Sequence, residues 1–391
     1  NSPFLTASNF RKDELENKLK NILADINTLK ETVFTVIDEL KKLRDAIDKI
    51  DNELLDLISK RATLASNIGS LKTDGVIYRP EREAQVLRRL VEQNQGPLSN
   101  ESIESIYKSI MSNCRALEKQ ITVAFLGPLG TFSEEASMKQ FGESIVSMQT
   151  SSIDEVFHLV ESHKAHYGVV PVENSTEGAI NRTLDLLLTS NTMICAEIIL
   201  PVHHNLISNE KDVSSIKKIY SHTQSLSQCH QWLLNHTPGI ELQSVSSNAE
   251  AVKIASKEKG AAAVASVRAA ALFNVPLLAE NIEDDPKNST RFLVISNHEV
   301  KPSGLDKTSI IVAAKNQPGA IASMIEPFAK NKVSMTKLES RPSKTGLWEY
   351  VFFIDVEGHM TDSKVADSLK EIESKASFLK VLGSYPQSNL T

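Results

Sequence analysis

Cysteine is scarce in this chain. The three residues, Cys114, Cys195 and Cys229, have no metal-ligand spacing and cannot all form disulfides with one another. A small and odd set of thiols is typical of a reducing compartment, so the sequence predicts a cytoplasmic protein. An excess of positive charge is also missing, because the formal net charge is −6. Since nucleic-acid binders usually carry a basic domain or stripe, we expect no nucleic-acid partner.

Long apolar runs are absent as well. Residues 11–31 are dense in charges of both signs and contain no signal-peptide core. The most apolar stretch, 184–207, is interrupted by Asp185, Glu197 and Pro201, so it lacks the pattern of a membrane span. We therefore expect no membrane partner. The length of 391 residues predicts two to four domains.

Glycine and proline are missing between Pro3 and Gly69, and one heptad pattern fills this stretch. It predicts a helix of about 55 residues, about 80 Å long, whose seam needs a partner helix. We predict that the partner comes from a second subunit, which makes a homodimer. An ordinary helix pair, or two helices broken near Thr32, are the alternatives. The seam residues alternate in steps of four and three: Leu15, Leu19, Ile22, Ile26, Leu29, Val33, Val36, Leu40, Leu43, Ile47, Ile50, Leu54 and Leu57.

Two shorter helices are predicted at 80–92 and 100–119, which makes residues 36–120 an all-helical unit after a helical extension at 1–35. Charged residues lie in it where apolar ones are expected. Arg61 falls on the heptad line, Glu83 on the apolar face of the second helix, and Glu118 beside that of the third. Because a buried charge is costly unless it is paired, several inward charges predict a pocket for a small dianion.

The segments Leu43-Arg44, Arg61, 69–72 and 79–83 resemble the all-helical chorismate mutase family. In that family two long helices pair across an intertwined dimer. The resemblance implies that Arg61 and a partner subunit's Arg44 bind the two carboxylates of chorismate. It also implies that the catalytic residues Lys72 and Glu118 hydrogen-bond the ether oxygen. The predicted chorismate-binding set is Arg44, Arg61, Lys72, Arg82, Glu83, Cys114 and Glu118, with Glu83 on the ring hydroxyl.

The expected rearrangement is concerted, so the enzyme has to hold the reactive conformer and stabilise charge on the ether oxygen. Arginines suit planar carboxylates. Two residues depart from the family pattern. Arg79 lies where some members carry an aspartate, and Glu118 lies where others carry glutamine. A glutamate can donate to the ether oxygen only when it is protonated.

From residue 121 the pattern changes to short strands followed by helices, which predicts an α/β region with a largely parallel sheet. The strands are predicted at 122–126, 168–172, 218–220, 261–265 and 292–295. This unit spans 121–299, and a polar link follows it. Residues 305–391 then show the order strand, helix, strand, strand, helix, strand, which is the ferredoxin-like α+β pattern.

Three loops in the α/β region place hydroxyl groups at the start of a predicted helix: 127–133, 171–178 and 220–225. Helix N-termini of this kind bind carboxylates, and such loops converge at one edge of an α/β sheet. A single loop of this kind is usually only a capped turn. None of them matches a nucleotide-binding pattern, and we expect no cofactor and no metal.

With the segment Asn288-Ser289-Thr290-Arg291-Phe292, these loops resemble prephenate dehydratase. The resemblance implies two lobes around a cleft, as in periplasmic binding proteins, and a catalytic role for Thr290. We hypothesise that Thr290 assists departure of the ring hydroxyl of prephenate and that Arg291 helps to hold the carboxylates. A lone loop histidine such as His222 is more often structural than a general acid. The predicted prephenate-binding residues are Thr131, Ser133, Asn174, Ser175, Ser221, Gln224, Arg291 and Phe292.

Two segments of the C-terminal unit, 316–321 and 339–342, resemble the signature segments of ACT domains in phenylalanine-regulated dehydratases. Gly319 would let the backbone approach a ligand closely. The resemblance implies that phenylalanine binds between two ACT domains as a feedback effector, so we expect the homodimer to form through both the helical and the ACT domains. The predicted effector-binding residues are Asn316, Pro318, Gly319, Ala320, Glu339, Ser340, Arg341 and Pro342.

Two other interpretations stay open on the sequence. A ligand-responsive regulator without catalytic activity would also combine a long helix, a two-lobed domain and a sensor, but no basic helix-turn-helix pattern is present. A dehydratase whose helical part only dimerises is the other. The inward charges Arg44, Arg61, Lys72 and Glu83 argue against it, because dimerisation alone does not need them.

Overall fold

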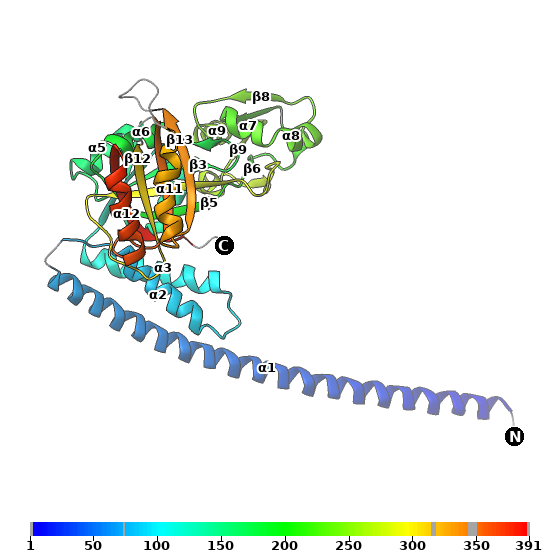
Figure 1. The fold of residues 1–391 in the computed structure, drawn as a ribbon. Coiled ribbons are helices and arrows are strands. Elements are labelled where there is room, and N and C mark those ends of the chain that lie inside the picture. The colour runs from blue at the N-terminus through cyan, green and yellow to red at the C-terminus, as the bar shows by residue number, and fades with distance from the viewer. Residues whose placement is uncertain (1–2, 73–74, 314–317, 343–349, 389–391) are drawn as a thin grey trace. The chain divides into compact units, whose positions relative to one another are not determined.

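The long heptad segment forms one continuous helix, α1, from Pro3 to Leu71 (Figure 1). The computed structural model describes residues 3–72, 75–313, 318–342 and 350–388, with side chains from residue 14 onward. Contacts divide the chain into two units, 1–64 and 65–391. The helix has no break at Thr32, so that alternative is wrong, and its 69 residues exceed the predicted length. Within the first unit the seam side chains are exposed, from Leu15 at 67% to Leu57 at 60%.

The second unit begins with two helices, α2 (Pro80–Gln93) and α3 (Asn100–Glu118), which confirm the prediction. Pro80 occupies the first turn of α2, where its missing N–H costs nothing. The Ser99 hydroxyl caps α3 by accepting the N–H of Ser102 at 3.2 Å. No helix in the described ranges combines the length and the apolarity that crossing a membrane requires.

The first α/β lobe is built on a mixed sheet with strand order β2-β1-β3-β11-β5, and β4 pairs with β3. The strands β1, β2 and β3 are parallel, whereas β11 is antiparallel to both β3 and β5. The elements are β1 (Ile121–Leu126), α4 (Phe132–Phe141), β2 (Ile145–Thr150), α5 (Ile153–Glu161), β3 (Tyr167–Asn174), β4 (Gly178–Ala179), α6 (Asn181–Thr189), β5 (Met193–Pro201) and β11 (Ser289–Ser296).

The second lobe lies between β5 and β11 in the chain and has its own sheet, in the order β10-β6-β9-β7-β8. The expected largely parallel sheet is therefore replaced by two mixed sheets, because the chain enters the second lobe and returns to the first. The elements are β6 (Asn205–Ile207), η1 (Val213–Ser215), β7 (Lys218–Ser221), α7 (Thr223–Gln228), α8 (His230–His236), β8 (Glu241–Ser244), α9 (Asn248–Ala255), β9 (Ala261–Ala265), α10 (Val267–Phe273) and β10 (Leu277–Ala279).

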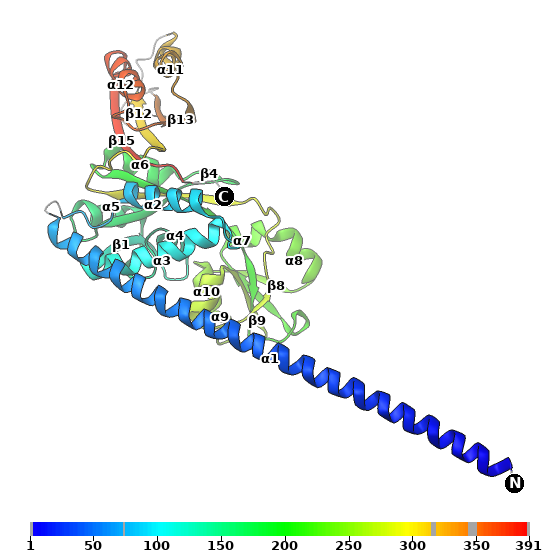
Figure 2. The same cartoon turned by 90° about the horizontal axis from the view of Figure 1, so that it is seen from below.

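The C-terminal domain has the antiparallel strand order β13-β14-β12-β15, which is the ferredoxin-like arrangement that the sequence predicts. Its helices cover one face of the sheet (Figure 2). The other face joins the core of the first lobe, since Ile311, Phe353 and Tyr385 pack in one cluster with Val170 and Leu184. The elements are β12 (Asp306–Ala313), α11 (Ala320–Lys330), β13 (Met335–Pro342), β14 (Tyr350–Glu357), α12 (Ser363–Lys375) and β15 (Phe378–Pro386).

Candidate active sites

Three residues predicted to bind chorismate lie together at the ends of the helical elements. Lys72 follows the last residue of α1, and its Nζ lies 2.8 Å from Oε1 of Glu118 at the end of α3. Lys72 also donates to the carbonyl of Ile77 at 3.1 Å. Cys114 is buried one turn before Glu118 on the same face of α3. The partly buried ammonium and carboxylate compensate each other, which a cluster of apolar neighbours could not do.

Glu83 is paired with Arg115, which was not predicted as a site residue. The Nη1 group of Arg115 donates to the Glu83 carboxylate, and its Nη2 group donates to the carbonyl of Phe141 at 2.7 Å. The Arg115 guanidinium also lies 5.0 Å from the ring centroid of Tyr78. Arg115 therefore fixes the position of Glu83. The position of Arg115 beside Cys114 in α3 does not indicate this role in the sequence. Phe141, at the end of α4, contacts Arg115 only in the folded protein.

The other predicted chorismate residues lie elsewhere on the helices. Arg44 and Arg61 are carried by α1, within the first unit. Arg82 is exposed on α2. The roles given to these residues, and that of Glu83 on the ring hydroxyl, stay predictions.

A cavity of about 420 Å³ lies between the two α/β lobes. It is formed by the loop after β1, the end of β3, the start of β11, and the starts of α7, α9 and α10. No lysine or arginine lines it among the described residues. Six of the residues predicted to bind prephenate or to act on it line this cavity: Thr131, Ser133, Asn174, Gln224, Thr290 and Phe292.

The cavity offers N–H and hydroxyl groups in place of cationic side chains. Thr131 precedes the first turn of α4, and Ser247 caps α9 by accepting the N–H of Glu250 at 3.1 Å. The first N–H groups of a helix have no intrahelical partner and carry partial positive charge, which favours anions. A dianionic ligand would therefore be held by helix N-termini, hydroxyls and amides.

Asn174 orients the hydroxyl of Thr290. The Oδ1 atom of Asn174 accepts the N–H groups of Thr176 and Glu177 at 3.0 and 3.2 Å, so Nδ2 must face the other way. That Nδ2 donates to Oγ1 of Thr290 at 2.9 Å and to Oδ1 of Asn288 at 3.0 Å. Because the Thr290 oxygen accepts from Asn174, its own proton is left to donate toward the cavity.

Three predicted prephenate residues do not line the cavity. The hydroxyl of Ser221 donates to the carbonyl of Val264 at 2.6 Å inside the second lobe. Ser175 accepts the N–H of Ser289 at 3.0 Å, which ties two loops together. Arg291 lies on the opposite face of β11 from Thr290, where it forms ion pairs with other strands.

Histidines contribute to the cavity in two ways. Nδ1 of His222 accepts the N–H of Gln224 at 3.4 Å and so caps α7. His204 is buried beside Phe132, and its Nε2 lies 2.8 Å from Oε1 of Gln228. Burial lowers the pKa of His204 below its usual value of 6.5. At neutral pH, burial therefore favours the neutral form of this imidazole.

Several lining residues were not predicted from the sequence: His204, Gln228, Ser247, Asn248 and Ser266. The sequence could have indicated Ser247, because Ser247 and Glu250 have the spacing of a capping box at the start of a helix. His204 and Gln228 come from separate segments of the second lobe, so no local pattern connects them.

The predicted effector residues fall in two places of the C-terminal domain, the start of α11 and the end of β13. Gly319 is the N-cap of α11 with φ of 81°, a left-handed conformation that glycine adopts without strain, and Pro318 and Ala320 flank it. Asn316 lies outside the described residues. Residues 339–342 are the last four of β13, at the edge of its sheet.

Arg341 of β13 contacts the first lobe, whereas Glu339 contacts a residue of its own strand. Nη1 of Arg341 lies 3.1 Å from Oδ1 of Asp185 and donates to the carbonyl of Asn181 at 2.7 Å. Oε2 of Glu339 lies 3.1 Å from Nζ of Lys337 on the same strand. The segment predicted to bind the effector thus contacts the dehydratase-like lobe directly.

Comparisons with known proteins cover each part of the chain. Residues 43–119 match the chorismate mutase type II family, 123–300 match prephenate dehydratase, and 308–374 match the ACT domain. A bifunctional chorismate mutase/prephenate dehydratase of Stutzerimonas stutzeri is 49% identical over 361 residues, covering 90% of this chain and 99% of that protein. The chain belongs to the bifunctional chorismate mutase/prephenate dehydratase family. It is an enzyme of phenylalanine biosynthesis with mutase, dehydratase and regulatory domains.

Two further relatives agree with this membership of the bifunctional chorismate mutase/prephenate dehydratase family. The protein of the same description from Aquifex aeolicus is 44% identical over 360 residues, covering 90% of this chain and 99% of its own. The crystal structure of a prephenate dehydratase from Arthrobacter aurescens in complex with L-Phe superposes with a TM-score of 0.64 and 32% identity, covering 68% of this chain and 90% of that one. About two thirds of the chain therefore has a solved counterpart.

Proposed function

We propose that this enzyme rearranges chorismate to prephenate in its helical domain and converts prephenate to phenylpyruvate in the cavity between the two lobes. The observation that carries the second step is the orientation of Thr290 by Asn174. In the proposed step, the bond to the ring carboxylate and the bond to the ring hydroxyl break, releasing carbon dioxide and hydroxide as the ring becomes aromatic. The Thr290 hydroxyl donates a hydrogen bond to the departing oxygen, which stabilises its growing negative charge.

For the mutase step we propose Lys72 and Glu118 at the ether oxygen and the arginines of α1 at the carboxylates. Lys72 supports this because its ammonium lies at a partly buried site and can stabilise the charge that develops on that oxygen. Cys114 and Glu83 complete the proposed site, with Arg115 holding Glu83 in place. No nucleophile is needed in a concerted rearrangement.

We further propose phenylalanine as the feedback effector, bound by the segments 318–320 and 339–342 of the ACT domain. The ACT family match and the phenylalanine complex of the Arthrobacter aurescens dehydratase support this. We also propose the division into residues 1–35, 36–120, 121–299 and 305–391. Three unpaired buried thiols support a reducing cytoplasm.

A homodimer is part of the proposal. The apolar side chains of α1 are exposed in the first unit, and exposed apolar surface of this extent is typical of an interaction site. The two-fold pairing of helices in the chorismate mutase family would cover this seam. The exposed seam therefore supports a second copy of the chain as its partner.

The test is to incubate the purified protein with chorismate and to follow the products over time, with and without phenylalanine. Phenylpyruvate formation, and its loss when phenylalanine is added, is the expected result. Accumulation of prephenate would remove the dehydratase assignment. If chorismate is not consumed, the same assay started from prephenate separates a dehydratase with a dimerising helix from a binding protein without activity.

A further inference from the structure

The two sheets that meet at the interface between the dehydratase and ACT domains carry charged residues at matched positions. In the dehydratase sheet, Thr290 pairs with Asn174 and Arg291 pairs with Glu173 in the register of β11 against β3. Side chains alternate between the two faces of a strand. Thr290 and Asn174 therefore face the cavity, whereas Arg291 and Glu173 face the ACT domain.

The ACT sheet presents its own matched pair toward the dehydratase. On β14 the side chains of Val351 and Phe353 pack into the dehydratase core, and Asp355 continues the same alternation. Asp355 is opposite Lys337 in the register of β14 against β13. Arg291 of the dehydratase sheet thus faces Asp355 of the ACT sheet. Glu173 in the same way faces Lys337.

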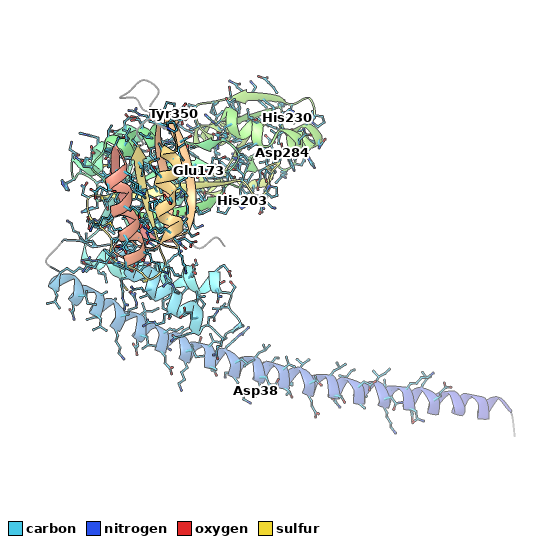
Figure 3. All side chains as sticks on the ribbon, viewed as in Figure 1. Asp38, Glu173, His203, His230, Asp284 and Tyr350 are labelled. Carbon is cyan, nitrogen blue, oxygen red and sulfur yellow. The ribbon has the colours of Figure 1, made fainter. Side chains whose placement is uncertain are left out.

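The charges pair across the interface at short distances. Nη1 of Arg291 lies 2.7 Å from Oδ2 of Asp355. Nζ of Lys337 lies 2.7 Å from Oε2 of Glu173, which is labelled in Figure 3. Oε2 of Glu197 lies 2.9 Å from Arg291, and Nζ of Lys307 lies 2.7 Å from Oε1 of Glu197. These six side chains, called here the interdomain charge cluster, are Glu173, Glu197, Arg291, Lys307, Lys337 and Asp355.

Because the interdomain charge cluster is buried, its charged groups must stay close to their partners. The side chains of Glu197, Asp355 and Arg291 are 2%, 9% and 13% exposed. Its three positive and three negative charges balance, and a buried charge that loses its partner is strongly destabilising. The cluster therefore holds β11 and β3 to β13 and β14, and a displacement of either sheet face must disturb these pairs.

We propose that the interdomain charge cluster transmits effector binding from the ACT domain to Thr290 and Asn174, with Arg291 and Glu173 acting as positioning residues. This inference rests on the proposed function. Lys337 is two residues before Glu339 on β13 and contacts it at 3.1 Å, so a ligand at residues 339–342 acts on the strand that carries Lys337. A shift of β13 displaces Glu173 and Arg291. These residues are the chain neighbours of Asn174 and Thr290, which therefore move as well. This movement changes the hydrogen bond that orients the Thr290 hydroxyl.

The test uses the full-length protein and the variants Lys337→Met and Asp355→Asn, neither of which touches the cavity. Dehydratase activity is measured from prephenate over a range of phenylalanine concentrations, and phenylalanine binding is measured by calorimetry. We expect phenylalanine to bind with an affinity within about twofold of the wild type, while half-inhibition requires at least about tenfold more of it. Because coupling is reciprocal, phenylpyruvate should also stop changing phenylalanine affinity in the variants.

Two controls separate coupling from a general effect of charge. Lys330→Met removes a lysine of the same domain whose pair with Glu371, at 3.1 Å, lies on the helical face of the ACT sheet, and it should respond to phenylalanine as the wild type does. Lys337→Arg keeps the charge and should restore inhibition. Lys337 lies at the edge of the cluster, so it carries the test if Asp355→Asn does not fold.

Other outcomes are distinguishable. Variants that are inhibited like the wild type would overturn the coupling proposal alone. Loss of phenylalanine binding in Lys337→Met would place this residue in the effector site and would also overturn it. A wild-type protein that makes phenylpyruvate without responding to phenylalanine would instead refute the regulatory part of the proposed function.

Discussion

At the scale of single residues, one amide decides which way the Thr290 hydroxyl points. Two backbone N–H groups fix Oδ1 of Asn174, so its Nδ2 donates to Thr290 and leaves the threonine proton for the ligand. The same strand turns the next side chain, Arg291, to the opposite face. Neighbouring residues of one motif therefore serve different sites.

Asn174→Asp tests this orientation without changing the size of the side chain. The carboxylate would accept the Thr290 proton, so that proton would no longer reach the ligand. We expect kcat for phenylpyruvate formation from prephenate to fall about 100-fold or more, and Thr290→Ala to do the same, because a positioned proton donor contributes about 10²–10⁴. Thr290→Ser should keep most of the activity, and Thr189→Ala, an exposed threonine on α6, serves as the control. Normal turnover in Asn174→Asp would refute the role given to the amide.

His204 makes stability depend on pH. Its folded-state pKa lies below 6.5 because of burial, so below that pH the unfolded chain binds a proton that the native state does not. The free energy of unfolding that depends on a neutral His204 is fully present above pH 6.5, and it is lost as the pH falls through the folded-state pKa. We expect the unfolding free energy, from urea titrations at about pH 7.5 and 5.5, to fall less in His204→Gln than in the wild type. Burial also lowers the pKa of the half-buried His166, so the difference between the two proteins is the informative quantity. An equal fall in both would contradict the prediction.

At the scale of elements, β15 docks the ACT sheet on the first lobe through a glycine. A Cβ on Gly383 would lie 2.2 Å from the carbonyl oxygen of Ile194 in β5, and φ at Gly383 is 150°. No flexible side chain can give way there, because the neighbouring atoms belong to the backbone. The close approach of β15 to β5 therefore requires glycine.

Gly383→Ala should loosen this contact between the domains. We expect a loss of about 1–3 kcal/mol of unfolding free energy, the usual cost of overpacking, together with weaker inhibition by phenylalanine. Gly239→Ala provides the matched control, because Gly239 also has positive φ, at 78°, but has open space around its Cβ position. Urea unfolding of the two variants makes the comparison. Equal losses would show that backbone strain alone, and no clash with β5, sets the cost.

At the scale of the whole molecule, the apolar seam of α1 requires a partner. In the first unit its side chains are exposed over a helix of 69 residues that ends in the second unit, at Leu71. A seam with heptad spacing is suited to another helix with the same spacing. The proposed homodimer satisfies this requirement with a second copy of the chain.

A single charge on the seam should weaken the dimer. We expect light scattering to show a dimer for the wild type and a shift toward monomer at micromolar concentration for Leu54→Glu, because burying an unpaired carboxylate is costly. Asn52→Glu places the same charge off the seam and should leave the mass unchanged. A wild-type monomer would refute the proposed homodimer, and a dimeric Leu54→Glu would place the interface elsewhere.

Sequence alone predicted the elements and the three family resemblances, because heptads, caps and strand alternation depend on residues that are close in the chain. Such local patterns predict the helices that begin at Pro80 and Asn100. They also predict the ferredoxin-like order of the last domain. Strand alternation also indicates that Arg291 and Thr290 face opposite sides, so the prediction that both line one cleft was wrong for Arg291. The expected largely parallel sheet was wrong, since the return of β11 between β3 and β5 leaves no local trace.

Tertiary structure decided the partners of the charged residues. Arg115 meets Glu83 across 32 positions of sequence, and Arg291 meets Asp355 from another domain. Such pairs depend on which strand or helix packs against which, and the nearby sequence is compatible with several partners. The sequence therefore determined which chemical groups the protein has, whereas the packing of distant segments determined which of them face a ligand and which face one another.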